Sequence, residues 1–321
     1  MPSLKEIKGR IGSVKSTLKI TSAMKLVASA KLRKAQQAIE GMRPYERKLQ
    51  GMLEHLMASG VRVSAEYTRV PSDEEPSPKP RVSLVAFASN SSLCGAFNAN
   101  VVRLTLETLR EYREADVTVY SIGRKMAEAM KKVGKPSPDD YQKLSDKPAY
   151  APAAILAEKL MDDFREGRLD RVELIYNHFV SSGKQVPVKE VLLPMQIPSP
   201  ASPVRNDKDV SFGRGDKESV IPGGFSPVIP SGAKESETEY ILEPSAADLL
   251  QDLLPKSLKL KFFTALLDSN ASEHAARTVA MQTATDNGED LLQELTLQYN
   301  KSRQQKITSE ILDLAGGTQQ Q

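Results

Sequence analysis

One stretch of the sequence sits where a phosphate site could form. Residues Ser89–Asn100 read SNSSLCGAFNAN and lie between a predicted buried strand and a predicted helix. Backbone N–H groups at such a junction can bind a phosphate. The stretch matches neither GxGxxG nor the Walker A pattern, because it has one glycine and no lysine. A plain strand-to-helix turn is therefore favoured, and a nucleotide-binding α/β enzyme remains an alternative.

Cys94 lies in the same stretch and is the only cysteine of the sequence. A nucleophilic cysteine needs a nearby base, and the histidines follow no motif: they are His55, His178 and His274. A buried, inert thiol is the favoured interpretation. A single cysteine also rules out an internal disulfide bond and fits a reducing compartment.

Neither the paired carboxylates nor the potential metal ligands of the sequence indicate an active site. Asp139–Asp140 and Asp162–Asp163 are adjacent residues, whose side chains diverge and cannot face each other as an acid–base pair. No cluster of His, Cys, Asp and Glu has metal-ligand spacing. We therefore expect no catalytic residues, no metal and no cofactor, and no enzyme activity of the chain alone.

Two polar features near the C-terminus are more informative. Glu273 and Arg277 stand at i,i+4 among small residues, which let helices approach closely. Asn300–Lys306 contains no apolar residue, yet it lies between Tyr299 and Ile307 in an otherwise amphipathic pattern. We expect this polar belt to face something other than a helical mate, the alternative being a solvated, weakened segment of a coil.

The first 50 residues are strongly basic. They contain three acids and twelve Lys or Arg, a net charge of +9, while the whole chain carries only +3. Such a helix suits an acidic partner, which can be nucleic acid, anionic lipid or an acidic protein surface. A solvated lysine face is the simpler alternative.

The same region has a heptad repeat. Positions 4, 7, 11, 14, 18, 21, 25, 28, 32, 35, 39 and 42 keep 3–4 spacing and are apolar except at Thr21 and Lys25. This pattern predicts one strand of a coiled coil. A helix from Leu4 to about Ser59, with a possible kink at Pro44, would be ~85 Å long and would project from any compact domain.

The C-terminal region offers a mate for this helix. Leu258–Leu314 has no proline, and apolar residues recur along it, including Val279, Leu291 and Ile311. Gly316–Gly317 is expected to end the helix. We predict an antiparallel pairing of the two terminal helices, with a parallel homodimer as the alternative.

The middle of the chain reads as an α/β domain. Strands are predicted at Arg81–Ser89, Asp116–Ile122, Arg171–Val180 and Val186–Met195, and helices at 98–112, 124–134 and 151–167. Their alternation favours a largely parallel sheet covered on both faces, similar to a Rossmann domain. A further strand is conceivable at Glu237–Pro244.

Changes in composition and periodicity along the chain predict three regions. Residues 1–70 form the N-terminal helical region, 71–245 the α/β domain and 246–321 the C-terminal helix. A Pro- and Gly-rich insertion at about 196–236 is predicted to be a surface excursion, either regulatory or neutral. Hydrophobic residues make up 40% of the 321 residues, and no apolar run could span a membrane. The N-terminus lacks the features of a secretory signal.

Three separated motifs resemble the gamma subunit of rotary F-type ATP synthases. They are SLKEIKGRIGSVKSTLKITSAMKLVASAKLRKAQ near the start, SSLCGAFNANV, and ASEHAARTVAMQTATDNGEDLLQELTLQYNKSRQQKITSEILDL near the end. The resemblance implies an antiparallel coiled coil that turns as a central rotor shaft, with the α/β domain below it. It also implies that the chain couples proton flow through the membrane to ATP synthesis without catalysing it.

The same resemblance implies partners and contact residues. The partners would be the alpha and beta subunits of the catalytic hexamer, the epsilon subunit and the membrane c-subunit ring, with no nucleic acid. Met24 and Lys25 would face an acidic loop of a beta subunit. The residues facing other loops of the hexamer would be Arg303, Gln304, Thr308 and Glu310. The chain would be peripheral, on the cytoplasmic face of the bacterial plasma (inner) membrane. A free coiled-coil scaffold that binds nucleic acid through its basic helix is the main alternative.

Overall fold

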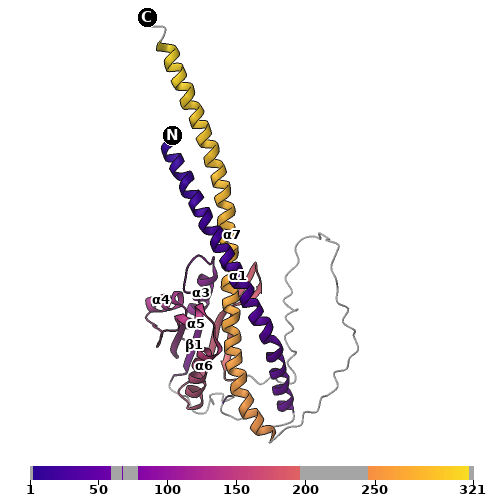
Figure 1. Ribbon diagram of the computed structural model, residues 1–321. Coiled ribbons are helices and arrows are strands. Elements are labelled where there is room, and N and C mark those ends of the chain that lie inside the picture. The colour runs from indigo at the N-terminus through magenta and orange to yellow at the C-terminus, as the bar shows by residue number, and fades with distance from the viewer. Residues whose placement is uncertain (1–2, 59–66, 68–78, 196–244, 318–321) are drawn as a thin grey trace, which may run out of the picture.

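The computed structural model describes residues 3–58, 67, 79–195 and 245–317. Two long helices dominate it: α1 (Leu4–Ala58) and α7 (Ala246–Gly317). They run antiparallel and pack against each other along much of α1 (Figure 1). The predicted antiparallel pairing within one chain is therefore confirmed, and α7 takes the place that a second copy would fill in a homodimer.

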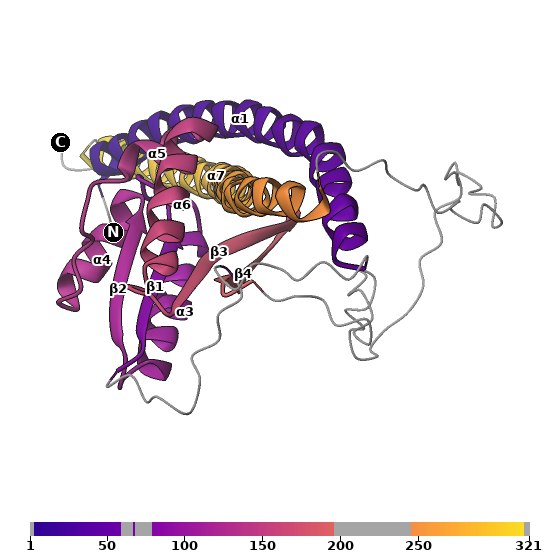
Figure 2. The same cartoon turned by 90° about the horizontal axis from the view of Figure 1, so that it is seen from below.

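The heptad repeat of α1 is confirmed in detail. All twelve predicted positions are buried or half-buried, while the lysines between them are exposed, except Lys25. Pro44 lies inside a continuous helix, and α1 bends towards its C-terminal end (Figure 2). Proline removes one N–H and crowds the preceding turn, which is a common cause of such bending.

The C-terminal end of α7 differs from the prediction. The helix begins at Ala246 and contains Pro255, and Gly316 and Gly317, which were expected to end it, are still helical. Pro255 lies in the third turn, where it removes one backbone hydrogen bond without ending the helix.

Two residues predicted to lie in the apolar stripe of α7 are exposed although α7 is paired with α1 there. The side chains of Val279 and Leu291 are 44% and 45% exposed. A straight helix drifts relative to a strict heptad, so position in the sequence alone assigns such residues to the wrong face.

A four-stranded sheet lies beside the coiled coil. Its strands are β1 (Arg81–Phe87), β2 (Asp116–Ile122), β3 (Arg171–Ser181) and β4 (Lys184–Leu193), in the spatial order β2-β1-β3-β4. The first three strands are parallel, as predicted, but β4 is antiparallel to β3. The two residues between β3 and β4 are too few for a crossover connection, so a hairpin was the only solution.

Helices cover both faces of this sheet. They are α3 (Phe97–Glu111), α4 (Arg124–Lys132), the short α5 (Gln142–Asp146), which was not predicted, and α6 (Tyr150–Arg165). The central strand β1 is buried on both faces. This two-sided burial explains the continuous apolar run of its sequence.

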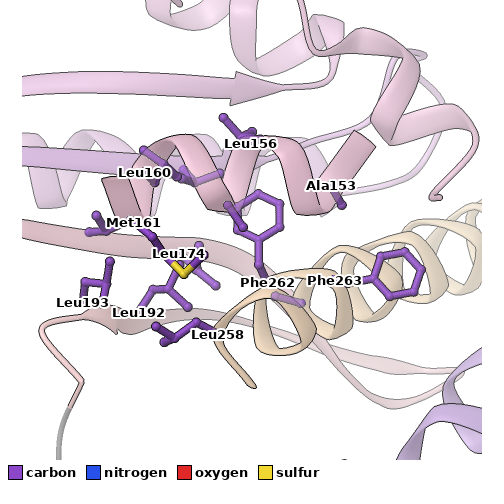
Figure 3. Close-up of a cluster of buried hydrophobic side chains, with 14 of the residues drawn as sticks. Ala153, Leu156, Leu160, Met161, Leu174, Leu192, Leu193, Leu258, Phe262 and Phe263 are labelled. Carbon is purple, nitrogen blue, oxygen red and sulfur yellow. The ribbon is translucent and has the colours of Figure 1, made fainter. Parts of the chain in front are cut away.

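The largest core lies between the sheet, α6 and α7. Leu160 and Met161 of α6 pack there with Leu174 of β3 and with Leu258 and Phe262 of α7 (Figure 3). Helix α7 thus forms half of the coiled coil and also covers one face of the sheet. This shared helix fixes the shaft to the α/β domain. The 196–236 insertion and the Glu237–Pro244 segment lie outside the described residues.

Candidate functional site

The middle of the coiled coil contains a polar layer. Thr285 Oγ1 donates a hydrogen bond of 3.0 Å to Thr21 Oγ1, and both residues are buried. One layer further along, Lys25 Nζ donates to Gln282 Oε1 at 2.7 Å. The heptad breaks at Thr21 and Lys25 are therefore matched by polar residues of α7. A paired polar layer fixes the register of a coiled coil.

The next layer is unusually close. A Cβ atom built on Gly288 would lie 2.7 Å from Leu18 Cδ2. Because a larger residue here would force the Leu18 side chain to move, the two helices approach each other closely at this layer. With Leu18 opposite Gly288 and Thr21 opposite Thr285, the start of α1 lies opposite about residue 302 of α7.

The register explains the exposed tip of α7. Beyond the start of α1, no other described segment pairs with the helix, and the side chains of Ile307 and Ile311 are 46% and 59% exposed. Figure 1 shows this end of α7 extending past the N-terminus. The polar belt Asn300–Lys306 lies at the point where the two helices separate.

The candidate contact residues of α7 all lie on this tip. Their side chains are exposed: Arg303, Gln304, Thr308 and Glu310. Glu310 forms an i,i+4 ion pair with Lys306 at 3.7 Å, and Thr308 Oγ1 donates to the carbonyl of Gln304. Such exposed pairs contribute little to stability, so these side chains are available for contacts with another protein.

The other two candidates lie about 22 residues into the shaft. Met24 is half-buried and lines a cavity, whereas Lys25 points across the coil to Gln282. The two neighbours therefore do not share one environment. Lys25 would have to leave Gln282 before its charge could face a partner.

The cavity beside Met24 has a volume of about 320 Å³. It lies between α1, α5, α7 and the turn that follows β1. Met24 and Val27 belong to its apolar wall, and its charged residues are Lys31, Asp146, Glu273 and Arg277. Val27 is 58% exposed, so the apolar wall continues onto the surface of the shaft.

The i,i+4 pair singled out from the sequence is a buried ion pair. Arg277 Nη2 donates to Glu273 Oε1 at 2.7 Å, and each side chain is about nine-tenths buried. Arg277 also donates to the Ser92 carbonyl at 2.6 Å and to Ser91 Oγ at 2.9 Å. Burial raises the pKa of Glu273 above its ordinary value, and the Arg277 partner opposes this shift. The guanidinium therefore joins the coiled coil to the turn after β1.

His274 is buried beside this pair. Burial lowers the pKa of its imidazole to about 4, and the positive charges of Lys31 and Arg277 act in the same direction. Its Nδ1 atom is buried and has no hydrogen-bond partner among the residues that the structure describes. The ring is therefore neutral at physiological pH. The burial of His274 beside the ion pair was not predicted, because no local pattern in the sequence marks it.

The Ser89–Asn100 turn is held by its own side chains. Asn98 Oδ1 accepts hydrogen bonds from the backbone N–H and the hydroxyl of Ser89, and Asn98 Nδ2 lies 3.1 Å from Cys94 Sγ. Cys94 is 1% exposed, which confirms a buried thiol. Leu93 has a positive φ of 66° and is 58% exposed at the crest of the turn.

Metal binding and membrane insertion find no support in the part of the chain described. No group of three His, Cys, Asp or Glu residues among residues 3–58, 67, 79–195 and 245–317 could hold a metal ion. Over the same ranges, every helix is too short or too polar to cross a bilayer.

Comparison with known proteins agrees with this architecture. Residues 3–319 match the family described as ATP synthase. The ATP synthase gamma chain of Bacteroides fragilis is 51% identical over 321 residues, covering 99% of each chain, and that of Bacteroides thetaiotaomicron is 48% identical over 323 residues, covering all of both chains.

Among solved structures, the rotor of the Euglena gracilis mitochondrial ATP synthase has the same fold. It aligns with a TM-score of 0.52 and 19% identity, over 95% of this chain and 98% of that chain. The full-length match to the family and the identity of about one half to its bacterial members agree with the coiled coil and α/β domain described above. The chain belongs to the ATP synthase gamma chain family, whose members are non-catalytic subunits of the central stalk.

Proposed function

We propose that the chain turns inside a hexamer of alpha and beta subunits and is driven from below by the membrane c-subunit ring, with an epsilon subunit bound beside it. The α/β domain would be the lower, membrane-proximal part. A solved relative from Tetrahymena thermophila comprises a central stalk and c-ring, which supports the second partner. The complex would lie on the cytoplasmic face of the bacterial plasma membrane, with this chain as a peripheral subunit.

The observation that carries this proposal is the slim shaft with an exposed tip that extends past the start of α1. Gly9, Gly12, Gly41 and Gly51 of α1 have open space where a Cβ would lie, so they face outward and keep the shaft narrow. A shaft that turns in a bore needs such small outward residues. Membership of the gamma chain family also disfavours the two alternatives, a nucleic-acid scaffold and a nucleotide-binding enzyme.

The division of labour along the chain follows from this role. Residues 1–70 and 246–321 would form the shaft, and 71–245 the domain that receives torque from the ring. Met24 and Lys25 would meet an acidic loop of beta, and the tip residues Arg303, Gln304, Thr308 and Glu310 would meet loops higher in the hexamer. Interaction between rotor and hexamer would be steric and electrostatic, with no covalent chemistry by this chain.

The tip assignment is tested in a reconstituted complex. Arg303→Ala combined with Gln304→Ala should lower ATPase activity about fivefold or more, because two lost hydrogen bonds to a partner, at about 0.5–1.5 kcal/mol each, total about 1–3 kcal/mol. Both side chains are exposed, so the melting temperature of the purified chain should not change. Gln293→Ala combined with Glu294→Ala, two exposed residues lower on the same helix, is the matched control. Equal activities of the two double variants would refute the assignment.

A further inference from the structure

One set of polar contacts joins α7 to the β3–β4 hairpin. Asp268 is 9% exposed, and its Oδ1 accepts a hydrogen bond from the backbone N–H of Phe179 at 2.9 Å. Its Oδ2 lies 2.5 Å from His178 Nδ1. One heptad earlier, Lys261 Nζ donates to the carbonyl of Val191 at 3.2 Å. A buried carboxylate thus holds β3, and a lysine holds β4.

A second set joins α7 to the other side of the domain. Asn270 Nδ2 donates to the carbonyl of Ser145 in α5 at 3.1 Å. One heptad later, Arg277 holds Ser91 and Ser92 in the turn after β1. The contacts of this set therefore reach the part of the domain that follows β1 and β2, far from the hairpin in the sequence.

The two sets lie on opposite faces of one helix. An α-helix turns about 100° per residue, so Asp268 and Arg277, nine residues apart, are about 180° apart around the axis and ~13.5 Å apart along it. Lys261 shares the face of Asp268, and Asn270 shares the face of Arg277, because seven residues bring a helix back to nearly the same face.

Opposed contacts of this kind resist rotation. The apolar contacts between α7 and the sheet are not directional, so they hold the helix in place with little resistance to turning about its own axis. Hydrogen bonds and ion pairs are directional, and bonds on opposite sides of an axis act together against torque. A shaft fixed on one side alone would pivot about that side.

We propose that Asp268, acting through His178 and Phe179, is a positioning residue that transmits torque, and that it forms a two-sided clamp with Arg277 on the opposite face of α7. The clamp fixes the shaft rotationally within the α/β domain. Phe179 strengthens it, because this residue packs against the coil cluster of Leu32, Ala35, Ala271 and Ala275. The clamp would thus reach both helices of the shaft from one end of the hairpin.

The test measures torsional stiffness in the complex reconstituted with alpha and beta subunits. The hexamer is fixed to a surface, and a bead is attached through Lys132→Cys at the exposed end of α4. Buried Cys94 does not compete for the label. During pauses at low ATP concentration, the angular variance of the bead should rise about twofold in Asp268→Ala, because one of two opposed contacts is lost. The exposed-site control Asp162→Ala should leave the variance unchanged.

Graded variants separate torque transmission from general destabilisation. Asp268→Asn keeps an acceptor for the Phe179 N–H, so its variance should rise less than that of Asp268→Ala, and both should rise further with Arg277→Gln. An unchanged variance in Asp268→Ala would overturn the proposal, whatever its melting temperature. If this variant fails to assemble, His178→Ala removes one of the two contacts of Asp268 with the hairpin, from a side chain that is 43% exposed, and an unchanged variance there would overturn the proposal as well.

Discussion

Replacing Arg277 with methionine should turn a satisfied buried carboxylate into an unpaired one. Methionine has a similar length and fills the space of the arginine stem, but it cannot donate to Glu273, Ser91 or Ser92. The Glu273 side chain would keep its burial, about 11% exposed, and lose its only charged partner within hydrogen-bonding distance among the described residues. The variant therefore isolates the electrostatic contribution of the guanidinium.

The expected cost is large at neutral pH and smaller in acid. Breaking a buried ion pair from one side typically costs about 3–5 kcal/mol. The carboxyl can reduce this cost by binding a proton, because its pKa in the folded state, already raised by burial, rises further without Arg277. A raised pKa gives stability below the unfolded-state value, near 4.5, and that stability is lost as pH rises through the folded-state value. In this window the loss approaches about 1.4 kcal/mol per pH unit.

Urea denaturation of the purified chain, followed by circular dichroism between pH 5 and pH 8, measures this effect. Arg277→Met should lose more stability relative to wild type at pH 8 than at pH 5. Adding Glu273→Gln should remove the difference and recover about 2 kcal/mol or more at pH 8, since the neutral amide needs no counterion. The exposed-pair control Lys256→Met should cost about 1 kcal/mol or less at every pH. A cost of Arg277→Met that is independent of pH, or no rescue by Glu273→Gln, would refute the reasoning.

Three further predictions concern His274, the close contact at Gly288 and the single cysteine. His274 is held neutral with a pKa of about 4, so wild-type stability should fall as pH drops from 6.5 towards 4, and His274→Gln should remove up to about 3 kcal/mol of that loss in urea titrations. Gly288→Val should destabilise the coil by about 1–3 kcal/mol in the same assay, and Leu18→Ala should partly restore it; no interaction between the two changes would contradict the close contact. Dithiothreitol and mild oxidants should not change ATPase activity through this chain, because Cys94 has no second cysteine to pair with; a response abolished by Cys94→Ser would show otherwise.

The sequence predicted the coiled coil well because its signal is local and repeated. Twelve heptad positions of α1 all turned out buried or half-buried, and even the polar exceptions Thr21 and Lys25 lie at the interface. The strands were placed within about two residues at their ends, since each combines an apolar run with flanking turn residues. The antiparallel β4 was missed although the short link at Ser182–Gly183 required it.

The contacts between shaft and domain could not be predicted in the same way. Arg277 bonds to Ser92 and Ser91, which precede it by 185 and 186 residues. Asp268 contacts His178 and Phe179, about 90 residues before it in the sequence. No periodic pattern marks such partners, because their meeting depends on how α7 lies against the sheet. The i,i+4 spacing of Glu273 and Arg277 was visible, but it did not reveal that the pair is buried. The roles of the tip residues remain predictions, since they depend on partners outside the chain.

The small-residue run around Ala271–Ala276 shows why the central part of α7 has its unusual composition. Ala271 and Ala275 are fully buried against Leu32 and Ala35 of α1. Ala276 packs on another side, against Cys94 and Phe97 of the domain. A helix covered on one side only needs an apolar stripe, whereas this segment is enclosed by α1, the sheet and the turn after β1. Larger side chains would push one of these neighbours away, so small residues fill the contacts and a few buried polar groups give them direction. The loss of a clean amphipathic pattern is thus a consequence of joining a shaft to a domain through one helix.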